Sequence, residues 1–156
     1  MVKEYELIKP QSALTLREEL MTLPDAYWVD RSKYYVNTGL QGEVGRYLSM
    51  GDRAMPTSLK ETLISIAPKK DIPLTEVVVN KYRKGDFLPK HIDEAGAKYC
   101  VLLSLEDSEE GLSSLDGLIP DKAGWVKEIP LSLVHWIEPA EKPRFTIIFL
   151  YDRTFR

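Results

Sequence analysis

Two histidines and an aspartate have the residue types and the spacing of a metal site. His91 and Asp93 are two positions apart and follow the apolar run 77–79 and a turn at 84–86. Side chains two residues apart in an extended segment point to the same side, so this imidazole and this carboxylate converge. Such a pair supplies two ligands of the 2-His-1-carboxylate arrangement that holds non-haem Fe(II). The only other histidine is His135, which is therefore the third candidate ligand.

A candidate anion-binding residue follows His135. Residues 135–150 are typical of a strand, a polar turn and a second strand, and Arg144 opens the second strand with Thr146 on the same face. A guanidinium in this position can hold a carboxylate through two parallel hydrogen bonds. A metal face beside an anchoring arginine is what a chelating keto acid such as 2-oxoglutarate needs. The same ligand types also accept Zn(II) or Mn(II).

Together these residues resemble the signature of the Fe(II)/2-oxoglutarate-dependent dioxygenases. The resemblance rests on His91-x-Asp93, then His135, then Arg144, and it spans residues 74–151. It implies that the two histidines and the aspartate bind Fe(II), and that 2-oxoglutarate and O2 are co-substrates. It also implies an enzyme that hydroxylates or oxidatively demethylates its substrate, with ascorbate as a stimulant.

The resemblance points to two branches of this superfamily. Asn80-x-Tyr82 ahead of the metal motif is similar to the AlkB-like branch, whose substrates are nucleobases. The short interval from His135 to Arg144 is more similar to the prolyl-hydroxylase branch. Leu150 also stands where AlkB-like proteins usually carry a second arginine.

The resemblance also implies roles for the residues around the keto acid. Arg144 would pair with its distal carboxylate, helped by the Tyr82 hydroxyl and by Thr146. Asn80 would orient the end of the keto acid that binds the metal.

Strand-rich segments joined by short turns predict a mainly β fold with flanking helices, of α+β type. This pattern argues against a doubly wound sheet and fits a double-stranded β-helix, the jelly-roll or cupin-like barrel. The 156 residues suit a single domain. Within it, residues 1–70 would form N-terminal helices and a substrate lid, and residues 74–151 the core. We expect helices over 12–21 and 58–66, and a loop over the acidic, Ser- and Gly-rich residues 106–120.

Aromatic residues ahead of the core are the candidates for the lid. Trp28, Tyr34, Tyr35 and Tyr47 could stack on an extruded base or on a ring of a peptide substrate. The alternative is that they pack helices onto the sheet, as buried aromatics commonly do.

Charge and composition narrow the partners and the location. A net charge of −3 does not favour broad nucleic-acid binding, although Lys81, Arg83, Lys84 and Lys90 leave a local basic patch open. No apolar run approaches the roughly 18 residues of a membrane span, and the first residues lack the apolar core of a signal peptide. The single Cys100 excludes disulfides within the chain. We therefore expect a protein of the reducing cytoplasm.

Three functions remain open at this point. The first, slightly preferred, is a dioxygenase that acts on a nucleobase. The second is a hydroxylase of a protein side chain, like the prolyl hydroxylases, or of a small molecule. The third is a cupin-like binding protein that keeps the residues without turnover.

Overall fold

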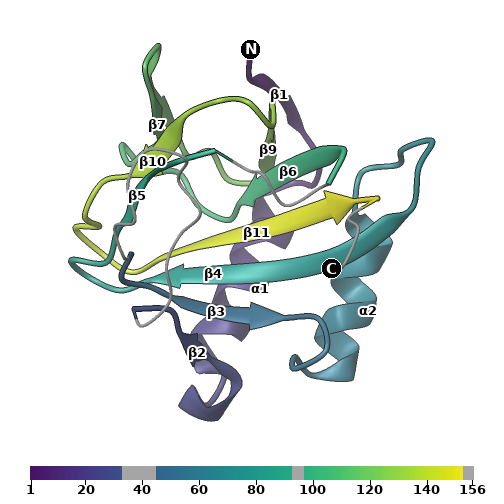
Figure 1. Ribbon diagram of the computed structural model, residues 1–156. Helices are drawn as coiled ribbons and strands as arrows, with labels where there is room; N and C mark the ends of the chain where they lie inside the picture. The colour runs from purple at the N-terminus through teal and green to yellow at the C-terminus, as the bar shows by residue number, and fades with distance from the viewer. Residues whose placement is uncertain (33–44, 93–96, 153–156) are drawn as a thin grey trace.

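The computed structural model describes residues 1–32, 45–92 and 97–152 and folds this part of the chain into two antiparallel sheets with two α-helices (Figure 1). The larger sheet has the order β1-β9-β6-β11-β4-β3-β2, and the smaller sheet has the order β5-β10-β7-β8. The elements are β1 (Lys3–Glu6), α1 (Pro10–Thr22), β2 (Val29–Asp30), β3 (Leu48–Gly51), α2 (Thr57–Ile66), β4 (Leu74–Tyr82), β5 (Leu88–His91), β6 (Tyr99–Ser104), β7 (Gly111–Ser114), β8 (Gly117–Pro120), β9 (Trp125–Ile129), β10 (His135–Ile137) and β11 (Arg144–Tyr151).

Eight consecutive strands, β4 to β11, are divided equally between the two sheets. The larger sheet takes β9, β6, β11 and β4, and the smaller sheet takes β5, β10, β7 and β8. The chain therefore crosses repeatedly from one sheet to the other, which is the winding of a double-stranded β-helix. The fold predicted from the sequence is confirmed.

The central strand β11 contributes side chains to the cavity on one face of the larger sheet and to the hydrophobic core on the other. Its even positions, from Arg144 to Leu150, line a cavity between the sheets. Its odd positions, including Ile147 and Phe149 with no exposed surface, belong to the core on the other face. Because both faces are covered, the strand is nearly continuously apolar in sequence rather than strictly alternating.

The two helices cover the face of the larger sheet that points away from the smaller one (Figure 1). Each helix presents apolar residues at helical spacing, and Ala13, Leu20, Leu59 and Leu63 have no exposed surface. Burying a leucine side chain fully contributes about 1.5–3 kcal/mol, so these contacts anchor both helices. Their positions agree with the predicted ones. Neither described helix has the length and apolar character needed to cross a membrane.

Residues 106–120, predicted as a loop, instead contain the hairpin of β7 and β8. The prediction was wrong because Ser and Gly were taken as loop residues, whereas all four residues of β7 are buried between neighbouring strands. Gly111 is required there, since a Cβ atom would lie 1.9 Å from the carbonyl oxygen of Ile119. The smaller sheet therefore has its full set of four strands.

A tight turn joins β4 to β5 and directs the strand that carries His91. The backbone N–H of Asp86 donates to the carbonyl of Arg83 at 2.8 Å, and Gly85 adopts a φ of +87° that favours glycine. The Asp86 carboxylate is fully buried and accepts from the Arg83 backbone N–H and Nε, both at 2.8 Å. Gly85 N–H also donates to Ala140 at 2.7 Å, which ties this turn to the β10–β11 connection.

Candidate active site

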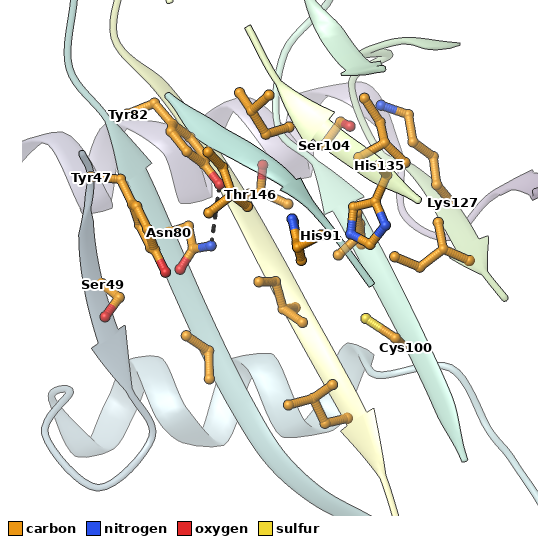
Figure 2. Close-up of a pocket in the computed structure, with 18 of the residues that line it drawn as sticks. Tyr47, Ser49, Asn80, Tyr82, His91, Cys100, Ser104, Lys127, His135 and Thr146 are labelled. Carbon is orange, nitrogen blue, oxygen red and sulfur yellow. Dashed lines mark hydrogen bonds between the residues drawn. The ribbon is translucent and has the colours of Figure 1, made fainter. Parts of the chain in front are cut away.

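A cavity of about 540 Å³ lies between the sheets, with larger-sheet residues on its floor and residues of β5 and β10 above it (Figure 2). Strand pairing orders the floor side chains in rows across the sheet. Beginning at the β4–β5 turn, the rows are Tyr82 with Arg144, then Ser49, Asn80, Thr146 and Ser104, then Val78, Ile148, Leu102 and Lys127, then Leu150, Cys100 and Ile129. The end nearest the turn is polar and deeply buried, and the far end is mostly apolar, with Val78, Leu102, Ile148 and Leu150 half-buried.

The two histidines lie side by side on neighbouring strands of the smaller sheet. His135 of β10 pairs in register with His91 of β5, and their ring centroids are 4.2 Å apart. Both side chains are buried and line the cavity. β5 starts at Leu88 beside the turn, so His91 lies about 10 Å farther along the strand at 3.3 Å per residue. The imidazoles therefore lie beyond the buried polar end that holds Tyr82 and Arg144.

Backbone carbonyls fix the tautomer of both imidazoles. His91 Nδ1 lies 2.8 Å from the carbonyl oxygen of Pro89, and His135 Nδ1 lies 2.8 Å from that of Leu133. A carbonyl only accepts, so Nδ1 of each ring donates, and the neutral form of each imidazole then has its lone pair on Nε2. This is how proteins commonly prepare histidines for a metal. The sequence did not reveal these carbonyl partners, each of which belongs to the residue two positions before its histidine.

The third predicted ligand, Asp93, lies outside the described residues, two positions after His91. Among residues 1–32, 45–92 and 97–152, no three His, Cys, Asp or Glu side chains gather as a metal site would require. The described residues thus bring together two of the three predicted ligands. Tyr34 and Tyr35 of the predicted lid also lie outside this part of the chain.

Arg144 is buried at the polar end of the cavity and already pairs with a carboxylate of the chain. Its Nε donates to Asp121 Oδ2 at 2.5 Å, and its Nη2 donates to Asp121 Oδ1 at 3.0 Å. Within the described part of the chain, the buried Nη1 makes no hydrogen bond. An unsatisfied buried donor of this kind costs free energy unless a ligand accepts from it. Arg144 therefore fits an anion bound in the cavity.

Lys127 brings a second cation to the Asp121 carboxylate. Neither Lys127 nor Asp121 was predicted from the sequence. Lys127 Nζ lies 2.8 Å from Asp121 Oδ1, and Ser104 Oγ donates to the same oxygen at 3.2 Å. Burial raises the pKa of the Asp121 carboxyl, but the hydrogen bond and charge of Arg144 and the charge of Lys127 outweigh it and hold this pKa below its ordinary range. Burial lowers the pKa of the Lys127 ammonium, against the attraction of Asp121. A lysine on the same strand face as the buried Ile129 was the available sequence signal.

The other predicted keto-acid residues lie on the cavity floor, as Figure 2 shows for Asn80, Tyr82 and Thr146. Asn80 Nδ2 donates to the Tyr82 hydroxyl at 3.3 Å, and Tyr82 stacks on Tyr47 with centroids 5.7 Å apart. Burial raises the pKa of the Tyr82 hydroxyl far above its ordinary range, so this group stays protonated. It can therefore donate a hydrogen bond to a carboxylate. Tyr47 also lines the cavity.

Trp28 does not reach the cavity, which corrects its prediction as a lid residue. It is 8% exposed and packs against Phe145 at 6.0 Å between ring centroids, in the core on the helix side of the larger sheet. Phe145 points away from the cavity because its neighbours Arg144 and Thr146 point into it. The alternative expected for these aromatics, packing helices onto the sheet, holds for Trp28.

No protein-family model matches the chain, and no curated protein matches it. Its fold is similar to that of solved structures. A prolyl-4-hydroxylase from Pseudomonas putida is 14% identical with a TM-score of 0.69, over 99% of this chain and 93% of that one. An oxidoreductase of the 2OG-Fe(II) oxygenase family from Burkholderia pseudomallei is 13% identical with a TM-score of 0.67, over 98% and 85%. HygX from Streptomyces hygroscopicus, solved with nickel and 2-oxoglutarate bound, is 12% identical with a TM-score of 0.68, over 99% and 83%. The chain therefore has, over nearly its whole length, the double-stranded β-helix fold of the Fe(II)/2-oxoglutarate oxygenases.

Proposed function

We propose that this protein is an Fe(II)- and 2-oxoglutarate-dependent oxygenase. The observation that carries the proposal is the pair His91 and His135, in register across two strands with both Nδ1 atoms bonded to carbonyls. Two buried imidazoles that line one cavity, with ring centroids 4.2 Å apart, suit a divalent transition metal. Asp93, two positions beyond His91, would complete the ligand set.

The polar end of the cavity fits the keto acid. Arg144 would offer its unsatisfied Nη1 to the distal carboxylate, and Tyr82, whose hydroxyl accepts from Asn80, pairs with Arg144 in the same row of the floor. Thr146 and Asn80 occupy the next row of the floor after Arg144. The keto acid would thus extend from the histidines toward the buried arginine.

With metal and keto acid bound, oxidative decarboxylation of 2-oxoglutarate to succinate and CO2 would place one atom of O2 in a C–H bond of the substrate. The protein's own part is to hold the ligands in place and to keep bulk water away. Burial of His91, His135 and Arg144 serves both purposes.

The apolar end of the cavity supports a substrate with an aliphatic part, such as a protein side chain or a small molecule. Beyond the histidines, half-buried apolar residues line the cavity, and they include Val78, Leu102, Ile148 and Leu150. This favours the prolyl-hydroxylase-like hypothesis over the slightly preferred nucleobase hypothesis. The similarity in fold to a prolyl-4-hydroxylase supports the same choice.

The basic cluster that kept a nucleic-acid substrate open is largely engaged within the protein. Lys81 Nζ lies 5.4 Å from the Trp28 ring centroid, on the helix side of the sheet. Arg83 pairs with the buried Asp86, and Lys90 Nζ lies 4.8 Å from the Trp136 ring centroid. These three cations contact three separate neighbours, which supports a substrate other than a nucleic acid.

The first test is succinate production from 2-oxoglutarate with Fe(II) and ascorbate under air, without an added substrate. Slow uncoupled turnover is expected in the wild-type protein, and the His135→Ala variant should produce none. If the wild-type protein binds neither Fe(II) nor 2-oxoglutarate, the proposal is wrong.

The substrate class is tested by stimulation of the same reaction. A proline-rich peptide and a single-stranded oligonucleotide would be added separately at low salt, with succinate as the readout. We expect the peptide to stimulate and the oligonucleotide to have no effect. Stimulation by the oligonucleotide alone would restore the nucleobase hypothesis.

A further inference from the structure

Arg144 of the proposed keto-acid site already forms an ion pair with Asp121. Asp121 holds its Nε and Nη2 atoms, so the bidentate edge of the guanidinium serves the chain itself. A buried arginine and a buried aspartate in contact carry no net charge as a pair. Such a pair on its own would attract a second carboxylate weakly, because Asp121 would repel it at short range.

Lys127 changes this balance. Its ammonium is buried and lies 2.8 Å from Asp121, on the same oxygen that accepts from Arg144 Nη2. Arg144 and Lys127 carry two positive charges against the one negative charge of Asp121, which leaves one positive charge in excess. Glu110 near Arg144 and Glu4 near Lys127 act more weakly than Asp121.

We propose that Lys127 is a specificity residue that acts through Asp121: by neutralising this carboxylate, it leaves the charge of Arg144 available to the distal carboxylate of a dicarboxylic keto acid. This inference rests on the proposed function and deepens it. Lys127 lies one row farther along the floor than Thr146 and reaches back to Asp121, so it acts on Arg144 through the shared acid.

The test uses two keto acids that differ only at the far end. 2-Oxoglutarate and 2-oxopentanoate have the same five-carbon chain, but only the first has the distal carboxylate. Their dissociation constants would be measured by calorimetry on full-length protein loaded with Mn(II), which prevents turnover. The dissociation constant of 2-oxopentanoate divided by that of 2-oxoglutarate reports recognition of the distal carboxylate. This ratio cancels any general loss of binding.

Three variants separate the mechanisms. Lys127→Met should lower the ratio about tenfold or more, because Asp121 then neutralises Arg144. Lys127→Arg, which keeps the charge, should retain most of the ratio. The double variant Lys127→Met/Asp121→Asn should recover it, because the acid that opposed Arg144 is gone. The double variant buries no carboxylate at this position, so it also guards against the Lys127→Met protein failing to fold.

Each other outcome would overturn the inference. An unchanged ratio in Lys127→Met would make Lys127 a structural residue. A ratio that falls and is not recovered in the double variant would mean that Lys127 contacts the keto acid itself. Should Lys127→Met not fold, a double variant with a ratio far below that of the wild type would refute it. If wild-type protein with Mn(II) bound does not bind 2-oxoglutarate, the proposed function itself fails, which is a separate result.

Discussion

Replacing Arg144 by methionine should separate anion binding from metal binding. The change removes two hydrogen bonds to Asp121, at 2.5 and 3.0 Å, from a pair whose side chains are each 4% exposed. Removing one partner of a buried ion pair typically costs about 3–5 kcal/mol. Lys127 remains 2.8 Å from the carboxylate and keeps it compensated, so we expect a loss at or below the lower end of this range, about 2–3 kcal/mol. In a chain of this size that lowers the melting temperature by about 5–10 °C.

The same change should lower the affinity for 2-oxoglutarate far more than the affinity for the metal. A hydrogen bond to a charged group contributes about 1.5–3 kcal/mol, which corresponds to roughly 10- to 100-fold in affinity. His91 and His135 lie about 10 Å along the strand from the turn beside Arg144. Their affinity for Fe(II) without keto acid should therefore change by less than about threefold.

Anaerobic calorimetry with Fe(II) and then 2-oxoglutarate measures both affinities, and thermal unfolding gives the stability. Arg17→Met is the matched control, since it removes an arginine that pairs with Glu106 at 3.1 Å away from the cavity. It should cost at most about 1 kcal/mol and leave both affinities unchanged. Equal losses of Fe(II) and 2-oxoglutarate affinity in Arg144→Met would refute the reasoning and make Arg144 purely structural.

Three further predictions follow from individual contacts. The pKa of the Asp121 carboxyl is lowered from 3.8 in the folded protein. The carboxylate therefore stabilises the fold above pH 3.8, and this stabilisation is lost as the pH falls further. The urea midpoint of wild type should drop more between about pH 5 and pH 3 than that of Asp121→Asn. His91→Gln and His135→Gln should each abolish Fe(II) binding in calorimetry while leaving the circular dichroism spectrum unchanged, and a collapsed spectrum would contradict a ligand role. Gly111→Ala places a methyl group 1.9 Å from a carbonyl oxygen and should cost more than about 2 kcal/mol in urea unfolding; a wild-type midpoint would show that the β7–β8 hairpin shifts freely.

The sequence predicted the strands that carry the site because their signals are local. Residues 135–150 were expected to form a strand, a turn and a second strand opened by Arg144, and β10 and β11 begin at His135 and Arg144. Alternation along β11 then places Arg144 and Thr146 on one face, whatever lies above the sheet. The pairing of His91 with His135 follows from the winding of the two sheets, which the resemblance to the superfamily supplied and the spacing alone did not.

Trp28 and the β7–β8 hairpin could not be predicted in this way. The face on which an aromatic side chain packs depends on the register of short edge strands, and β2 has only two residues. Likewise, β7 is a strand because its backbone pairs with β10 on one side and β8 on the other. Tertiary pairing of this kind overrides the low strand preference of Ser and Gly.

The buried charges at the polar end of the cavity are the least predictable feature and the most informative one. Asp121, Lys127 and Arg144 come from three separate segments and meet only when β9, β6 and β11 are in register. Apolar residues of similar volume in place of a buried ion cluster are often neutral or stabilising, so such a cluster adds little to stability. An arrangement that buries two cations on one carboxylate and leaves a guanidinium nitrogen unsatisfied is therefore better explained by binding than by folding. The anion that completes it would restore both the charge balance and the missing hydrogen bond.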